Sequence, residues 1–288
     1  MAHKINPMFD PMFPVWERNY RTNISRHNFD QRNIRSLRIM QNKHGGRTCV
    51  LVAAAPHLVN NAHLLKPFNR TYYIICCDVV MPYLKESGVI PNYVITIDPN
   101  EVIEKYINHV DPITTTLICS TASCPGVYFF PGLIYCFNQQ DKISFKRDFF
   151  KALNRPTPYF PDLVNLDFVG LTMYQVARYM GFKTILLAGY GFGYLDGKMF
   201  CPGVLETRGE KQKKPAIQFT SETLIRYCQY MAQTIGPFRT VEELDAEYES
   251  THKVSAQSKD VINCTEGGLL TCNNMRLEEA LLKYGGQQ

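Results

Sequence analysis

Residues 165–193, NLDFVGLTMYQVARYMGFKTILLAGYGFG, predict a helix followed by a buried strand. Leu171 and Tyr174 have the spacing of apolar residues on one face of a helix. Gly181 suits the C-terminal end of that helix, because glycine adopts the left-handed backbone conformation found there at little cost. The run KTILLA that follows has the length of a buried strand, and a glycine-rich loop comes after it. This order of elements is typical of one repeating unit of an α/β protein.

Five other apolar runs have the length of a strand, at residues 48–54, 72–77, 93–97, 115–119 and 133–137. Several of the segments between them are long enough to hold a helix, and this alternation is expected of an open α/β sheet. The run 48–54 is apolar on both faces, which indicates a central parallel strand. We therefore predict an α/β fold with an open, mostly parallel sheet and helices on both of its faces.

The composition is that of a folded globular protein, since 45% of the 288 residues are apolar and 20% are charged. Ten cysteines are irregularly spaced and several lie inside apolar runs, which predicts free buried thiols and a reducing, cytoplasmic location. The first twenty residues contain prolines and lack the apolar core of a secretory signal. No uncharged apolar stretch reaches the roughly 20 residues that cross a bilayer, so we expect no membrane span.

Positive charge is concentrated near the N-terminus: the net charge is +5, and residues 17–47 contain eight basic and two acidic side chains. We expect residues 1–46 to form a basic helical arm, and residues 47–288 to form the main domain with a helical region at its C-terminus. Such an arm could attract an acidic partner, for example nucleic acid. The favoured interpretation is a helix that packs Ile34 and Leu37 on the body while its arginines lie in solvent.

Candidate ligand-binding residues lie in the loops that follow the strands, because open parallel sheets bind ligands beyond the carboxyl ends of their strands. Residues 54–58, AAPHL, follow the first long strand. Pro56 suits the first turn of a helix, and the free backbone N–H groups at a helix start could hold phosphate oxygens. The alternative is an ordinary turn between a strand and a helix.

Two carboxylates follow the next two strands. Asp78 and Asp98 come directly after predicted strands, and parallel strands would place both at the same edge of the sheet. Such a pair could bind Mg²⁺ or hydrogen-bond a ribose. For Asp98 the alternative is a helix cap in front of Pro99.

Two glycine-containing loops complete the candidate site. The glycines of residues 189–193 follow a strand, but no clear helix follows them, so they predict a loop open to close approach and not a dinucleotide fingerprint. Residues 263–268, NCTEGG, could present Thr265 and Glu266 to a ligand, or could form a structural turn. The sequence contains no zinc-ligand spacing, nucleophile elbow or P-loop motif.

Four motifs in this order resemble a known family: VAAAPHL at 52–58, GVIPNYVITIDP at 88–99, GFKTILLAG at 181–189 and NCTEGG at 263–268. From about residue 17 to 281 the chain is similar to the 6-hydroxymethylpterin diphosphokinase MptE-like family, which includes the Maf motility-associated flagellin glycosyltransferases. The resemblance implies a Rossmann-like domain that binds a nucleotide. It also implies a likeness to bacterial sialyltransferases, which use CMP-activated sugars.

Differences from the family pattern fall at polar positions. Ala55 and His57 stand in a turn where the family usually has Gly-Pro-Ser, Gly191 stands where a Gly-Gln-Asp motif has its aspartate, and Phe200 takes the place of a histidine. The diphosphokinases resemble enzymes with closely spaced aspartates that bridge Mg²⁺ to ATP, whereas this chain has Asp98 followed by proline. A single aspartate fits the glycosyltransferase branch better.

The resemblance therefore implies a transferase that uses a nucleotide-activated sugar of the CMP type and a small-molecule, glycan or protein acceptor. The expected nucleotide-binding residues are Ala54, Ala55, His57, Asp78, Gly189, Gly191, Thr265 and Glu266; the expected catalytic residues are Asp98, which would also bind Mg²⁺, and His252 as general base. Two alternatives stay open. One is an ATP-dependent 6-hydroxymethylpterin diphosphokinase, and the other is a catalytically inert binding or assembly module.

Overall fold

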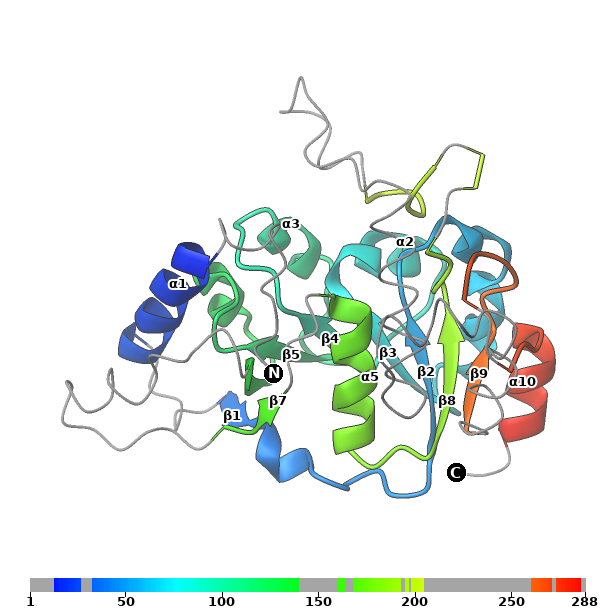
Figure 1. Cartoon of the computed structure of the whole chain (residues 1–288), viewed down its shortest axis with the longest axis horizontal. Coiled ribbons are helices and arrows are strands. Elements are labelled where there is room, and N and C mark those ends of the chain that lie inside the picture. The colour runs from blue at the N-terminus through cyan, green and yellow to red at the C-terminus, as the bar shows by residue number, and fades with distance from the viewer. Residues whose placement is uncertain are drawn as a thin grey trace, which may run out of the picture.

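The computed structural model describes residues 13–26, 33–139, 160–163, 168–192, 195–196, 198–204, 260–270 and 273–285. Its strands form a nine-stranded sheet in the order β1-β6-β5-β4-β3-β2-β8-β9, with β7 paired to β6 (Figure 1). The bounds are β1 Ile34–Ser36, β2 Thr48–Val52, β3 Tyr73–Cys77, β4 Tyr93–Thr96, β5 Thr116–Ser120, β6 Ile134–Gln139, β7 Asp162–Leu163, β8 Thr184–Ala188 and β9 Val261–Asn263. Every described strand pair is parallel, which confirms the predicted α/β fold.

The helices are short, and many are 3₁₀ helices. The α-helices are α1 Phe13–Arg26, α2 Met81–Glu86, α3 Ile103–Ile107, α5 Val169–Tyr179 and α10 Leu277–Tyr284; the 3₁₀ helices are η2 Leu37–Met40, η3 Pro56–Asn60, η4 Ala62–Phe68, η5 Asp78–Val80 and η6 Pro125–Phe129. Prolines lie in the first turn of η3 and η6 and inside η4. Because proline lacks the N–H that a continuing helix requires, it favours short helices. The connections between β2 and β6 are therefore compact.

Helices cover both faces of the sheet, as predicted. α5 packs across β2, β3 and β4 on one face (Figure 1). The chain passes from β2 to β6 in one direction and then returns to β8 on the other side of β2. Because crossovers between parallel strands are right-handed, this reversal places α5 on the face opposite to the short helices.

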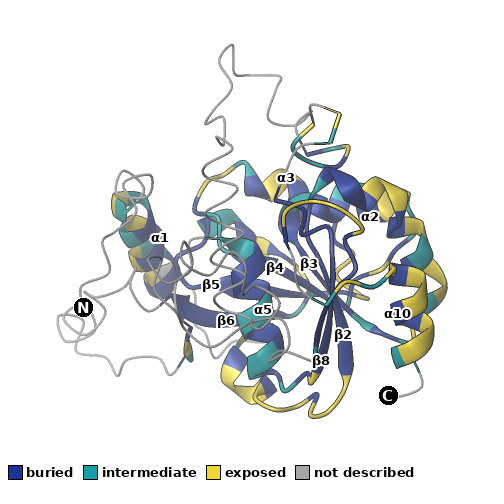
Figure 2. Cartoon of the chain, turned by 45° about the vertical axis from the view of Figure 1, so that its right-hand side comes forward, coloured by how far each residue is buried: buried dark blue, intermediate teal, exposed yellow. Residues whose placement is uncertain are grey.

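The central strands are buried on both faces, and Figure 2 shows them as the dark interior of the molecule. All five residues of β2 and all five of β8 are buried. This explains their continuous apolar sequence, because side chains on both faces meet a covering helix. All eight cysteines of the described residues are free and buried, as predicted, and burial raises the pKa of thiols such as Cys77 well above the ordinary value.

The N-terminal segment differs from the predicted helical arm. α1 is a helix, but residues 34–40 form the edge strand β1 and the 3₁₀ helix η2. Asn33 fixes this edge, since its side-chain amide donates to the backbone oxygens of Phe130 and Gly132 at 3.1 and 2.9 Å. Leu37 is buried as expected. None of the helices in the described ranges has the length and apolar character needed to cross a membrane.

Candidate functional site

The order of the strands changes direction between β2 and β8. The strands that follow β2 in sequence, β3 to β6, extend to one side, whereas β8 and β9 lie on the other side. In open α/β sheets the loops at such a point diverge, and ligands bind beyond the carboxyl ends of the strands there. The loops after β2, β8 and β9 therefore form the candidate site, and we call them the switch-point loops: residues 53–58, 189–192 and 264–269.

The first two switch-point loops lie close together. The N–H of Ala53 donates to the oxygen of Ala188 at 2.9 Å, and the N–H of Ala55 donates to the oxygen of Gly189 at 3.1 Å. Gly189 has φ of 72°, and a Cβ at this position would lie 2.1 Å from the oxygen of Ala53. Only glycine permits this approach, so the loop after β8 brings its backbone against the loop after β2.

His57 occupies the centre of the three loops. Its ring is so close to Gly191 and Gly267 that a Cβ on these glycines would lie 2.6 Å from Nδ1 and 2.4 Å from Cδ2, respectively. His57 is buried, and its Nδ1 has no hydrogen-bond partner among the residues that the structure describes. Burial lowers the pKa of His57 below its ordinary value of 6.5, so the imidazole is neutral at pH 7. Gly191, which the sequence placed in a loop open to close approach, therefore makes room for this ring together with Gly267.

The third loop is fixed by its own polar side chains. Thr265 is fully buried, and its hydroxyl accepts the N–H of Tyr190 at 2.9 Å. Oε1 of Glu266 accepts the N–H of Leu277 at the start of α10, at 3.0 Å, and lies 3.4 Å from the side-chain amide of Asn61. The structure therefore brings Thr265 and Glu266 to the switch point, where their oxygens connect the loop after β9 to the loop after β8, to α10 and to Asn61.

Asp78 and Asp98 lie at the same edge of the sheet, as parallel strands require. Asp78 begins η5 directly after β3, is 3% exposed and accepts the N–H of Val79 at 2.7 Å. Asp98 follows β4 and is partly exposed; its Oδ1 accepts both the backbone and side-chain N–H groups of Asn100 at 2.8 Å. Both carboxylates are held in fixed orientations by neighbouring residues.

The described residues contain no group of three or more His, Cys, Asp or Glu side chains that could hold a metal ion. Asp98, the expected Mg²⁺ ligand, belongs to no such group in this part of the chain.

A further segment crosses the same edge. The N–H of Cys201 donates to the oxygen of Ala54 at 2.9 Å, and the hydroxyl of Tyr106 donates to the oxygen of Val204 at 2.8 Å. Phe200, next to Cys201, packs against the hydrophobic core. The position that the resemblance associates with a histidine thus lies beside the switch-point loops. His252, the expected general base, lies outside the described residues.

A row of buried polar side chains at the ends of β5 and β6 was missed by sequence analysis. Ser120 donates to Oε1 of Gln139 at 2.8 Å, and Thr121 donates to Oδ1 of Asn138 at 2.9 Å. The side chain of Asn23 on α1 donates to the backbone oxygens after β5, so α1 covers this part of the edge. The signal was present in the sequence, because polar residues follow both apolar runs, but no candidate residue was assigned after either run.

The family model described as 6-hydroxymethylpterin diphosphokinase MptE-like matches residues 19–197. Among solved structures, the chain is similar to the MAf glycosyltransferase from Magnetospirillum magneticum AMB-1, with 14% sequence identity and a TM-score of 0.55. The similarity covers 93% of this chain but 38% of that one, so the chain spans less than half of that protein. At this identity the likeness concerns the fold. No curated protein matches the chain.

Proposed function

Because the chain belongs to the MptE-like family, we propose that it is a nucleotide-dependent transferase of the glycosyltransferase type, with a CMP-activated sugar as donor. Membership in this family supports a transferase-type role. The observation that carries the proposal is the switch point, where small residues of two loops meet at the carboxyl edge of a parallel sheet. Sites of this kind hold nucleotides in other open α/β proteins.

The phosphate of the donor would lie against the loops after β2 and β8. Among Ala54, Ala55, Gly189 and Gly191, the partly exposed Ala55 is where the phosphate would approach the two loops, since the space beside Gly189 and Gly191 is taken by Ala53 and His57. Transfer of the sugar leaves negative charge on the departing phosphate, and backbone N–H dipoles fixed in advance stabilise such charge. His57 adds a neutral imidazole that can donate or accept one hydrogen bond there.

Asp98 would contact the ribose, the base or a phosphate-bound Mg²⁺. It is partly exposed, and Asn100 fixes the orientation of its carboxylate, so it faces a ligand at little cost in side-chain entropy. Asp78 is buried one strand closer to the switch point, where it would contribute mainly through its negative charge. Thr265 and Glu266 would act by holding the third loop in place. Deprotonation of the acceptor hydroxyl by a general base completes the proposed chemistry.

Calorimetric titration with CMP, CDP, UDP, ADP and ATP tests the proposal, followed by turnover of a CMP-sugar. We expect a cytidine nucleotide to bind more tightly than the others. Absence of binding by all five nucleotides would contradict the proposal and would favour the inert binding module.

The variant Asp98→Asn tests the role of the carboxylate. Asparagine retains the oxygen that accepts both Asn100 hydrogen bonds, so we expect an unchanged melting temperature and loss of turnover. Asp111→Asn is a matched control, because Oδ1 of Asp111 also accepts a loop N–H, from Ile113 at 3.0 Å. Asp111 precedes β5 and therefore lies at the amino ends of the strands, away from the candidate site. If the Asp98 carboxylate takes part in the reaction, Asp98→Asn loses activity and Asp111→Asn keeps it. If Asp98 merely caps the chain, its variant keeps both activity and stability, because asparagine caps about as well as aspartate.

The description of the family supports a second candidate, an ATP-dependent 6-hydroxymethylpterin diphosphokinase. Metal and fixed cations must then neutralise the phosphate charge during transfer. Incubation with ATP, Mg²⁺ and 6-hydroxymethyl-dihydropterin should in that case release AMP. AMP formation no faster than in a blank would remove this candidate.

A further inference from the structure

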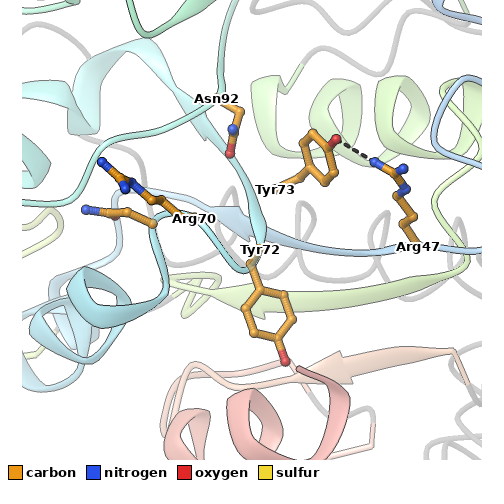
Figure 3. Close-up of a pocket in the computed structure, with 6 residues that line it drawn as sticks. Arg47, Arg70, Tyr72, Tyr73 and Asn92 are labelled. Atoms are coloured by element: carbon orange, nitrogen blue, oxygen red, sulfur yellow. Dashed lines mark hydrogen bonds between the residues drawn. The ribbon is translucent and has the colours of Figure 1, made fainter. Parts of the chain in front are cut away.

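A cavity lies at the opposite edge of the sheet, at the amino ends of the strands. Its volume is about 420 Å³, which is within the usual range for small-molecule sites. Six residues line it: Arg47, Asn69, Arg70, Tyr72, Tyr73 and Asn92 (Figure 3). Arg47 directly precedes β2, Tyr73 begins β3 and Asn92 directly precedes β4. The cavity is therefore separate from the switch-point loops, which follow the other ends of these strands.

The charge of this cavity is positive and uncompensated. Two arginines line it, and no acidic residue of the described ranges does. In the described part of the chain, the ion pairs are those of Arg21 and Arg276, and no carboxylate pairs with Arg47 or Arg70. An anion that entered the cavity would meet two cations without displacing an acidic partner.

Arg47 is held in position by aromatic residues. Its Nη1 donates to the Tyr73 hydroxyl at 2.6 Å, and its guanidinium lies 5.5 Å from the centre of the Tyr73 ring. The Tyr73 ring packs against His44, with ring centres 4.3 Å apart, and His44 stacks on Phe182 at 4.7 Å. These contacts orient the guanidinium and leave its remaining N–H groups available, so a ligand does not have to order this side chain.

The polar groups of the cavity offer donors more than acceptors. Oδ1 of Asn92 accepts the N–H of Ile74 at 2.8 Å, which turns its amide N–H₂ group toward other partners. Oδ1 of Asn69 accepts the N–H of Ile90 at 3.0 Å. The Tyr72 hydroxyl donates to α10 at 2.6 Å and points away from the cavity (Figure 3). The carbonyl oxygens of both asparagines are thus occupied, whereas the other N–H groups of Arg47, the guanidinium of Arg70 and the amide N–H₂ of Asn92 have no acceptor among the described residues.

We propose that this cavity binds a phosphate-bearing small molecule. Figure 3 shows the Arg47 and Arg70 side chains on either side of Tyr72 and Tyr73. Donors on several sides suit a tetrahedral phosphate, whose oxygens point in several directions, better than a planar carboxylate. The partly exposed Tyr73 ring between them provides an apolar surface for the organic part of the ligand.

Calorimetric titration with phenyl phosphate tests this site, with benzoate as the carboxylate of similar size and the full chain as the protein. Arg70→Gln is the main variant, because the Arg70 side chain forms no hydrogen bond or ion pair with the described residues and its replacement should leave the fold intact. Arg47→Gln removes the oriented guanidinium. Arg35→Gln on β1 is the control, since it makes the same charge change elsewhere on the surface.

The expected result is binding of phenyl phosphate that is at least tenfold weaker in Arg70→Gln and in Arg47→Gln, and unchanged in Arg35→Gln. Shifts of the Tyr73 ring resonances on titration should locate the ligand. No binding by the natural chain, equal affinity in Arg70→Gln, or equally tight binding of benzoate would overturn the proposal. A nucleotide is not used as probe, because it would also report on the switch-point loops; the two proposals thus fail independently.

Discussion

Replacement of Gly189 by alanine tests the close approach of the loops after β2 and β8. With φ of 72°, an alanine at this position costs about 1–2 kcal/mol from backbone strain alone. Its Cβ would also lie 2.1 Å from the Ala53 oxygen, so the loops must separate, and such overpacking costs about 1–3 kcal/mol. Separation breaks the 3.1 Å hydrogen bond from Ala55 to Gly189, which is worth about 1 kcal/mol. We expect Gly189→Ala to lower the free energy of unfolding by about 3–6 kcal/mol.

The variant Gly46→Ala separates the two causes. Gly46 has a similar φ of 80°, but nothing lies within 4 Å of the position of its Cβ. We expect this variant to lose only the cost of backbone strain, about 1–2 kcal/mol. Urea unfolding measures both losses, and titration with CMP measures whether the folded Gly189→Ala protein loses nucleotide affinity. Equal losses of stability in the two variants would refute the claim that close approach of the loops is what requires glycine at 189.

Two further predictions concern buried polar groups. Burial and neighbouring cations lower the pKa of His44 from 6.5 to about 4, so between these pH values the unfolded chain binds a proton that the folded chain does not, and stability falls as the pH falls. Urea unfolding at pH 7 and at pH 5 measures this effect. On going from pH 7 to pH 5, the free energy of unfolding of His44→Phe should fall by about 2 kcal/mol less than that of the natural chain. The same pH dependence in both proteins would contradict this. Thr265→Val should cost about 1–3 kcal/mol, because it leaves the buried Tyr190 N–H without an acceptor. Thr48→Val, whose buried hydroxyl has no partner, should cost nothing in the same assay, and equal losses would argue against the Thr265 contact.

The sheet and its main helix could be predicted because buried faces require apolar residues, which leave a recognisable pattern in a short stretch of sequence. A strand covered on both faces, such as β8, is a continuous apolar run, and a helix with one covered face, such as α5, repeats its apolar residues every three to four positions. These patterns do not depend on distant partners. Residues 34–40 were predicted incorrectly, because the spacing of Ile34 and Leu37 fits a helix as well as a strand end followed by a 3₁₀ turn. The amide of Asn33, bonded to residues almost 100 positions away, decided between them.

The edge of the sheet that carries the candidate site followed from sequence, since parallel strands place all their carboxyl ends together. The partner of each side chain did not. The Thr265 hydroxyl accepts the N–H of Tyr190, and the Glu266 carboxylate accepts the N–H of Leu277. These hydrogen bonds form only when segments separated in the sequence meet. The cavity with Arg47 and Arg70 was missed for the same reason, because its residues come from the starts of different strands. Sequence periodicity determined which faces are buried; the direction and occupancy of each hydrogen-bonding group were decided by tertiary structure, because both depend on atoms that only the folded chain brings within about 3 Å of each other.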